Sequence, residues 1–288
     1  MMRKGYFLTA LIFMLMASNS CVQTAYKGKP LDVNSICNAG SECSIYSGRY
    51  VIDVRGVKRG FIVTLPENYD KTRSYPLIFI WHGFGHTAVD MAERSYYGIL
   101  KESENRAIFI AGQGLPAFIP GMGTRPGWQN LNGRDVAFAK TLINWAKSNL
   151  SIDETRIFSA GMSYGGMFSN LLACRLGTRI RAIAVMSGNF GGIGIRIPDK
   201  QCTREHVAAW FSHSPDDRFV PYSKGEAARD YFITTNECTN SFSKATTDGC
   251  VTYNDCAAGY PVTWCSHRKG HKVPDYAGRE IWKFFNQF

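Results

Sequence analysis

The segment from Ile157 to Gly166, IFSAGMSYGG, constrains the fold more than any other part of this chain. It places Ser163 between Gly161 and Gly165, after a short apolar run typical of a buried strand and before residues with helical apolar spacing. A strand that turns sharply into a helix crowds its own backbone, so the flanking glycines leave the room that the turn requires. The pattern predicts a nucleophile elbow, in which the serine hydroxyl projects alone. A glycine-rich turn around an inert serine is the alternative.

The rest of the chain predicts one large α/β domain. The sequence has 288 residues, and no Pro- or Ser-rich linker divides it. The runs Leu77–Trp81 and Ala107–Ala111 are continuously apolar, as expected for strands covered on both faces, and Asp135–Asn149 has the pattern of an amphipathic helix. Alternating strands and helices predict parallel pairing with right-handed crossovers. Arg49–Val54 and Phe61–Leu65 predict an antiparallel hairpin at the sheet edge.

Two further segments carry specific expectations. We expect one helix from about Met91 to Glu104, and a loop rich in Gly and Pro from Gly112 to Gly133. The remaining expected elements are the strands Ile183–Met186, Val207–Ser212 and Val262–Cys265 and the helices Ser223–Thr234 and Ile281–Phe285.

The first 20 residues have the pattern of a secretory signal peptide. Arg3 and Lys4 precede an uncharged apolar run, Tyr6 to Ala17, which small polar residues follow. A membrane anchor is the competing interpretation, but the run is shorter than the ~20 residues that span a bilayer. A lipoprotein signal ending at Cys21 is a further alternative. We therefore expect a secreted protein with a signal peptide at 1–20, an N-terminal extension at 21–45 and a catalytic domain at 46–288.

The cysteines fit an exported chain. After Cys21, eight remain: Cys37, Cys43, Cys174, Cys202, Cys238, Cys250, Cys256 and Cys265. An even set predicts disulfides, and the absence of any Cys-x-x-Cys spacing argues against a zinc site. The pairs to test first are Cys37 with Cys43 and Cys174 with Cys202.

The charge balance is strongly basic. The chain has 33 Lys and Arg against 23 Asp and Glu, a formal net charge of +10. Scattered basic residues without a recognition motif argue against nucleic acid as a partner, and we expect no membrane partner and a monomer. A solvated basic surface is the simplest interpretation, and an acidic polysaccharide stays open as a partner.

A serine nucleophile needs a base and usually a carboxylate that orients the base. Asp216 and Asp217 follow one predicted strand, and His267 and His271 follow the last. We predict His271 as the base, because Gly270 lets its loop bend back over the sheet. His206 and His213 flank a strand, and we expect them to be structural.

Backbone amides should stabilise the oxyanion. Tyr164 follows the nucleophile and Phe84 lies in the loop after the first buried strand, so we predict their N–H groups as the two donors. Trp128, in the Gly/Pro loop, and Phe84 are candidate platforms for a planar acyl group.

Taken together, the motifs resemble the secreted feruloyl esterases and acetyl xylan esterases of carbohydrate esterase family 1, relatives of the extracellular polyhydroxybutyrate depolymerases. The segments that carry the resemblance run from about Tyr46 to the C-terminus and include YPLIFIWHGFG, AIFIAGQGL, GWQNLNGRDVAFAKTLI, RIFSAGMSYGGMFSNLLAC, RAIAVMSG, HSPDDRFVPY and GYPVTWC with GHKVP. The chain departs from the family after its first histidine, where Phe84-Gly85-His86 stands, and His86 is therefore a further candidate substrate contact.

The resemblance implies an α/β-hydrolase fold and a triad of Ser163, Asp217 and His271. The family's aspartate precedes a Val-Pro pair, here Val220-Pro221, which favours Asp217 over Asp216. It implies a serine esterase that removes feruloyl groups from plant polysaccharide such as arabinoxylan, with no metal or organic cofactor. The alternatives are an acetyl xylan esterase, a polyester depolymerase and a non-catalytic carbohydrate-binding protein on the same scaffold.

Overall fold

The computed structural model describes residues 29–36, 45–191 and 202–288. The predicted signal peptide, most of the predicted extension and the proposed Cys37–Cys43 pair lie outside these residues. The strands are β1 (Leu31–Asp32), β2 (Gly48–Val54), β3 (Val57–Thr64), β4 (Tyr75–Trp81), β5 (Ile108–Gly112), β6 (Leu115–Ile119), β7 (Gly123–Gly127), β8 (Ile152–Met162), β9 (Ala182–Met186), β10 (Ala208–His213), β11 (Cys250–Thr252) and β12 (Val262–Ser266).

The helices have the following bounds: α2 (Val33–Ile36), α3 (Ala88–Glu93), α4 (Ile99–Ser103), the short 3-10 helix η1 (Leu131–Gly133), α5 (Arg134–Asn149), α6 (Tyr164–Leu176), α7 (Tyr222–Thr235) and α8 (Ala277–Phe285). None of the helices in the described ranges has the length and hydropathy that a membrane span needs.

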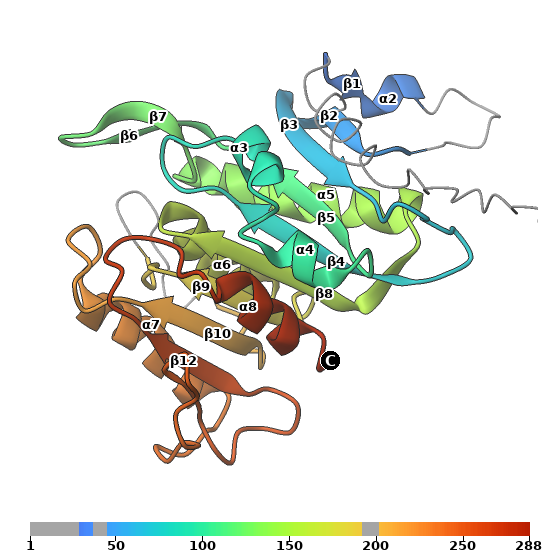
Figure 1. Cartoon of the computed structure of the whole chain (residues 1–288). Helices are drawn as coiled ribbons and strands as arrows, with labels where there is room; N and C mark the ends of the chain where they lie inside the picture. The colour runs from blue at the N-terminus through green and yellow to red at the C-terminus, as the bar shows by residue number, and fades with distance from the viewer. Residues whose placement is uncertain (1–28, 37–44, 192–201) are drawn as a thin grey trace, which may run out of the picture.

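Ten of the described strands form one twisted sheet in the order β1-β2-β3-β5-β4-β8-β9-β10-β12-β11 (Figure 1). The run from β5 through β4, β8, β9 and β10 to β12 is parallel. The predicted hairpin is β2–β3, which pairs antiparallel on one side of this run, and the short β11 pairs antiparallel at the other side. In a parallel sheet all carboxyl ends of strands lie along one edge, so the loops after β4, β8, β10 and β12 meet there.

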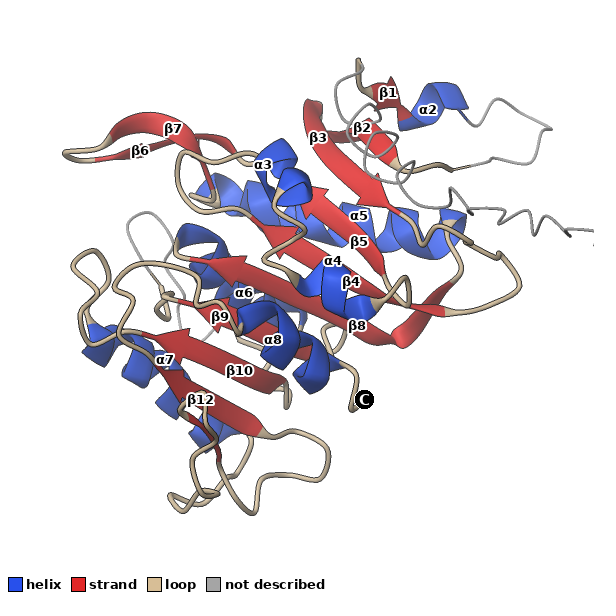
Figure 2. Cartoon of the chain, in the orientation of Figure 1, coloured by secondary structure: helices blue, strands red, loops and turns tan. Residues whose placement is uncertain are grey.

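Helices cover both faces of the sheet, as Figure 2 shows. In β4, Leu77 and Phe79 pack into the same buried cluster as residues of α5, α6 and α7. Ile78 and Ile80 pack on the opposite face with residues of α3, α4 and α8. A strand buried on both faces explains why this segment is continuously apolar.

The predicted helix from Met91 to Glu104 is wrong, because the chain forms two short helices, α3 and α4, at this place. Between them, Ser95, Tyr96 and Tyr97 have φ angles of 51°, 53° and 62°. Such left-handed backbone is rare for bulky residues and persists when tertiary contacts fix it. The two tyrosine hydroxyls supply such contacts, since Tyr96 bonds the Thr64 hydroxyl and Tyr97 bonds a carbonyl at the end of β4.

The predicted loop from Gly112 to Gly133 contains a β-hairpin, β6–β7, which projects beyond the main sheet in Figure 1. At its base Gly114 packs directly on Gly127, and a Cβ on Gly114 would lie 2.6 Å from the Gly127 carbonyl oxygen. The two strand segments of this hairpin, LPAFI and GTRPG, do not alternate apolar and polar residues. The sequence pattern therefore does not indicate strands here.

Three disulfides join described cysteines. Cys174–Cys202, a predicted pair, is confirmed, and it ties α6 to the segment before β10. Cys250–Cys265 joins directly paired residues of β11 and β12, and Cys238–Cys256 joins the segment after α7 to the connection between β11 and β12.

Candidate active site

Ser163 occupies the turn between β8 and α6, as the elbow motif predicts. Its backbone has φ 55° and ψ −120°, a conformation that non-glycine residues adopt only when their surroundings impose it. The Ser163 N–H donates to the Met186 carbonyl at 2.8 Å, and the Ser163 carbonyl accepts from the Met167 N–H at 2.9 Å. These two bonds hold the serine at the junction between the sheet and the helix.

Both flanking glycines are required by close backbone approach. A Cβ on Gly161 would lie 2.3 Å from the Gly165 carbonyl carbon. A Cβ on Gly165 would lie only 1.9 Å from the carbonyl oxygen of Trp81, at the end of β4. The elbow is therefore packed against the neighbouring strand through bare backbone, and no side chain fits at either position.

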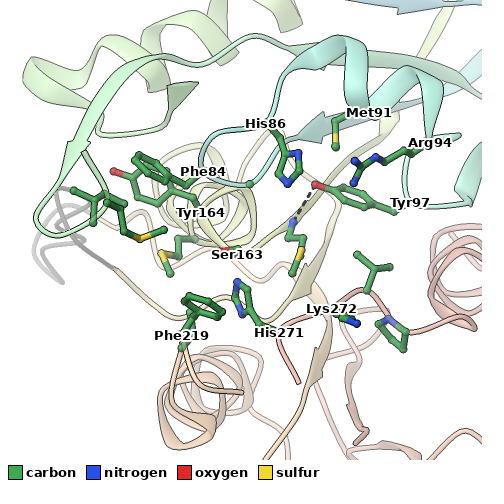
Figure 3. A pocket seen from close by; sticks show the side chains of 18 of the residues that line it. Phe84, His86, Met91, Arg94, Tyr97, Ser163, Tyr164, Phe219, His271 and Lys272 are labelled. Atoms are coloured by element: carbon green, nitrogen blue, oxygen red, sulfur yellow. Dashed lines mark hydrogen bonds between the residues drawn. The ribbon is translucent and has the colours of Figure 1, made fainter. Parts of the chain in front are cut away.

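His271 and Asp217 come from loops at the same edge of the sheet. Asp217 follows β10 and His271 follows β12, and Asp217 Oδ2 lies 2.7 Å from His271 Nδ1. This bond places the Nδ1 proton between the two side chains. Nε2 is then the ring nitrogen that can accept a proton. Ser163 and His271 line one pocket, and Figure 3 shows the imidazole directed towards the serine.

The Asp217 carboxylate is buried and accepts several hydrogen bonds. Burial alone would raise its pKa, but bonds from the Val220 N–H, the His271 ring and the Phe219 N–H outweigh burial and lower the pKa below its ordinary value. His213 Nε2 lies 3.5 Å from the same carboxylate, but its hydrogen bond goes to the Val220 carbonyl at 2.9 Å. Asp217 therefore stays ionised beside His271.

The other candidate aspartate and histidines do not line the pocket. Asp216 is exposed and forms an ion pair with Arg268 at 3.3 Å. His267 is buried, which lowers its pKa, and its Nδ1 accepts from the Lys269 N–H at 3.2 Å. His206 packs edge-on against the Tyr260 ring, away from the pocket.

The two predicted oxyanion donors lie beside the serine, on one side of the pocket. Phe84 and Tyr164 both line the pocket, with ring centroids 6.0 Å apart in an edge-on arrangement. A Cβ on Gly83 would lie 3.9 Å from the Ser163 Cβ, so the loop that carries the Phe84 amide passes directly beside Ser163. His86, the other residue expected to contact substrate, lines the same pocket.

Buried His82 fixes this loop. Its Nδ1 lies 2.8 Å from the Gly83 carbonyl, and its Nε2 accepts from the Gly114 N–H at 2.9 Å. Nε2 can accept only in the neutral ring, so the proton is on Nδ1. Burial lowers the pKa of His82 from 6.5 to about 4, which keeps the ring neutral.

The prediction that Trp128 is a platform for the acyl group is wrong. Its side chain is fully buried, stacks on Phe168 with ring centroids 4.8 Å apart, and donates its indole N–H to the His82 carbonyl at 2.8 Å. It supports the loop from beneath and does not line the pocket. Trp128 directly follows β7, and its ring packs against Trp81 and Phe168 in the core.

The pocket has a volume of about 700 Å³ and includes residues that sequence patterns did not indicate. They are Met91, Arg94, Tyr97, Ile119, Met122, Phe219 and Lys272. Tyr97 has the clearest task, because its hydroxyl donates to the Trp81 carbonyl at 2.8 Å and accepts from the Met162 N–H at 3.3 Å. It joins the end of β4 to the residue before the nucleophile (Figure 3).

Known esterases are similar to this chain over most of its length. No family model matches the chain. A feruloyl esterase D from Neurospora crassa is 29% identical over 259 residues, which cover 82% of this chain and 84% of that protein. A probable feruloyl esterase C from Aspergillus terreus is 28% identical over 79% of this chain and 83% of that protein. This chain is a homologue of the feruloyl esterases. The predicted resemblance is thus confirmed, as is the enzyme class, a carboxylic ester hydrolase.

Solved structures show the same fold. An acetyl xylan esterase from Aspergillus awamori has a TM-score of 0.63 at 16% identity and covers 83% of this chain and 99% of its own. A family 1 ferulic acid esterase from Anaeromyces mucronatus, solved with ferulic acid, has a TM-score of 0.56 at 15% identity and covers 86% of this chain and 94% of its own. The predicted α/β-hydrolase fold is confirmed.

Proposed function

We propose that this chain is a secreted serine esterase that removes feruloyl groups from plant cell-wall polysaccharide such as arabinoxylan. The observation that carries the proposal is the bond between Asp217 and His271 beside Ser163, in a pocket with aromatic walls. The relatives named feruloyl esterase support the acyl group, and the three disulfides support an extracellular location.

The geometry supports a two-step acyl transfer. Ser163 Oγ attacks the ester carbonyl carbon, while His271 Nε2 takes the hydroxyl proton. The carbonyl becomes an oxyanion, which the N–H groups of Phe84 and Tyr164 stabilise. Asp217 holds the imidazole in the required tautomer and stabilises its positive charge.

Collapse of the tetrahedral intermediate breaks the bond to the sugar oxygen, and His271 gives its proton to that oxygen. The free sugar hydroxyl leaves, and the ferulate remains as an ester on Ser163. Water then attacks this ester with His271 again as the base, and the second collapse releases ferulic acid and restores the serine hydroxyl. Every proton in the cycle passes through His271, so no other acid or base is needed.

An acetyl xylan esterase is the second candidate, because one of the similar structures is an acetyl xylan esterase. The pocket argues for the larger acyl group. Its volume of about 700 Å³ is within the range of about 300–1,000 Å³ that holds whole small molecules, and aromatic rings from Phe84, Tyr164 and Phe219 line it. An acetyl group would leave most of this apolar surface uncovered.

The test uses the purified mature chain and its Ser163→Ala variant. We expect the wild type to hydrolyse methyl ferulate with a higher kcat/KM than acetylated xylan, and to be labelled by a fluorophosphonate probe. The variant should lose both hydrolysis and labelling. Labelling that persists in the variant would remove Ser163 from the mechanism, and a preference for acetylated xylan would favour the second candidate.

A further inference from the structure

The pocket has two sides of different chemistry, which Ser163 separates (Figure 3). One side is aromatic and apolar, with Phe84, Tyr164 and Phe219 grouped together. The opposite side carries two cations, Arg94 from the end of α3 and Lys272 from the loop after β12. An ester bound with its carbonyl at Ser163 extends one half towards each side.

Within the described residues, neither Arg94 nor Lys272 forms an ion pair, although acidic groups lie nearby. Asp275 also lines the pocket, but its carboxylate pairs with Lys269. Asp90, one turn before Arg94 on α3, accepts bonds from the Thr87 N–H and hydroxyl at 2.7 and 2.9 Å. Arg94 also interacts electrostatically with the Asp90 carboxylate, but neither pocket cation forms an ion pair with a described residue.

We propose that Arg94 and Lys272 form a subsite for a carboxylate on the alcohol half of the ester, the carboxylate of a uronic acid residue next to the feruloylated sugar. The inference rests on the proposed function, because an aromatic acyl group on the apolar side leaves the saccharide on the cationic side. A guanidinium can bind a carboxylate through two parallel hydrogen bonds, and an ammonium adds a second charge. The net charge of +10 attracts such acidic chains from a distance.

A carboxylate could also belong to the acyl half, as in a half-ester of a diferulic acid. The apolar side is the wrong environment for such a group, since burying an unpaired carboxylate beside aromatic rings is costly. Placing the carboxylate on the sugar half therefore predicts that the enzyme prefers esters with an acidic sugar half over esters with an acidic acyl half, and substrates of the two kinds test this.

The experiment measures kcat/KM for methyl ferulate and for feruloylated oligosaccharides with and without a uronic acid residue. The decisive quantity is the ratio of the acidic to the neutral oligosaccharide. We expect a ratio of about five to ten at about 0.02 M ionic strength, because both cations are exposed and screening is weak there. In about 0.5 M NaCl the ratio should approach one, since the screening length falls below about 5 Å.

Arg94→Gln combined with Lys272→Gln should lower the low-salt ratio to about two or less. The matched control is Lys140→Gln combined with Lys244→Gln, which removes the same charge from exposed positions that do not line the pocket. The control should keep most of the wild-type ratio. Equal losses in both double variants would reduce the effect to net charge and overturn the subsite.

The other outcomes are also decisive. A wild-type ratio near one at low salt would refute the inference while leaving the proposed function intact, provided that methyl ferulate is hydrolysed. No hydrolysis of any feruloyl ester would refute the proposed function itself. A preference for the diferulate half-ester that the pocket double variant abolishes would place the carboxylate on the acyl half and contradict the assignment.

Discussion

Acid should destabilise this fold through His82, the buried histidine that holds the loop of the Phe84 amide. Its Nε2 accepts the Gly114 N–H at 2.9 Å, and a proton on Nε2 would abolish that bond and leave a charge in a buried site. The folded protein therefore resists protonation of this ring, and its pKa is about 4 against 6.5 for an ordinary histidine.

Proton linkage gives the sign and the size of the change in the free energy of unfolding. Because the pKa is lower in the folded state, the unfolded chain takes up the proton first as the pH falls, and the free energy of unfolding decreases. The decrease is about 1.4 kcal/mol per pH unit once the pH is below 6.5, and it ends near pH 4. Between pH 7 and pH 4.5 the loss is about 2 kcal/mol from this one residue.

Burial lowers the pKa of His213 and His267 as well, so they act in the same direction and the wild type alone does not isolate His82. The measurement is urea unfolding of the wild type and of His82→Gln at several pH values between 7 and 4.5, with disulfides intact. Glutamine does not titrate, so the difference in unfolding free energy between the two proteins should shrink by about 2 kcal/mol over this range. A difference that stays constant within about 0.5 kcal/mol would show that His82 is not the source.

Three further changes test the geometry of the site. Asp217→Asn should lower kcat for methyl ferulate by about 10⁴ while the fold is retained, because an amide cannot fix the same imidazole tautomer; a loss below tenfold would contradict the role. Gly165→Ala should prevent folding or lower the melting temperature strongly, since its Cβ would lie 1.9 Å from the Trp81 carbonyl oxygen, whereas Gly60→Ala has no contact closer than 3.6 Å and should behave as the wild type in thermal unfolding. Tyr97→Phe removes the hydroxyl between β4 and the elbow, and we expect kcat to fall about tenfold with a smaller change in KM; a change confined to KM would mean that Tyr97 binds substrate instead.

The parts of the site that sequence reasoning located share one physical property. Ser163, Asp217 and His271 each follow a buried strand, and a parallel sheet brings the ends of such strands to one edge. Apolar runs in the sequence mark these strands clearly, so the order of strands and polar residues predicts which loops meet. The choice between Asp216 and Asp217 depended on the resemblance, because both follow the same strand.

The residues that line the walls of the pocket could not be predicted from the order of the strands. Tyr97 reaches the pocket through a left-handed turn that begins at Ser95, and nothing in the local residue types indicates positive φ there. The Gly/Pro segment predicts Trp128 as a candidate pocket residue, but its indole N–H bonds the His82 carbonyl inside the core. Long-range hydrogen bonds determine both positions, and a pattern within one segment carries no information about them.

Different parts of the fold carry the proposed chemistry and the substrate preference. The proposed reacting groups stand on strand ends that pack backbone against backbone, as Gly165 against Trp81, so substitutions there disturb the packing of the sheet. The walls come from the β6–β7 hairpin, which carries Ile119 and exposes Met122 at its turn, and from loops that carry Phe219. Phe219 holds Asp217 through its backbone N–H, and Met122 lies exposed at the hairpin turn, so these side chains can change in size or charge while Ser163 and His271 keep their geometry. Acyl and sugar preference can therefore diverge between homologues that retain the same reaction, and feruloyl and acetyl xylan esterases on one fold are the expected result.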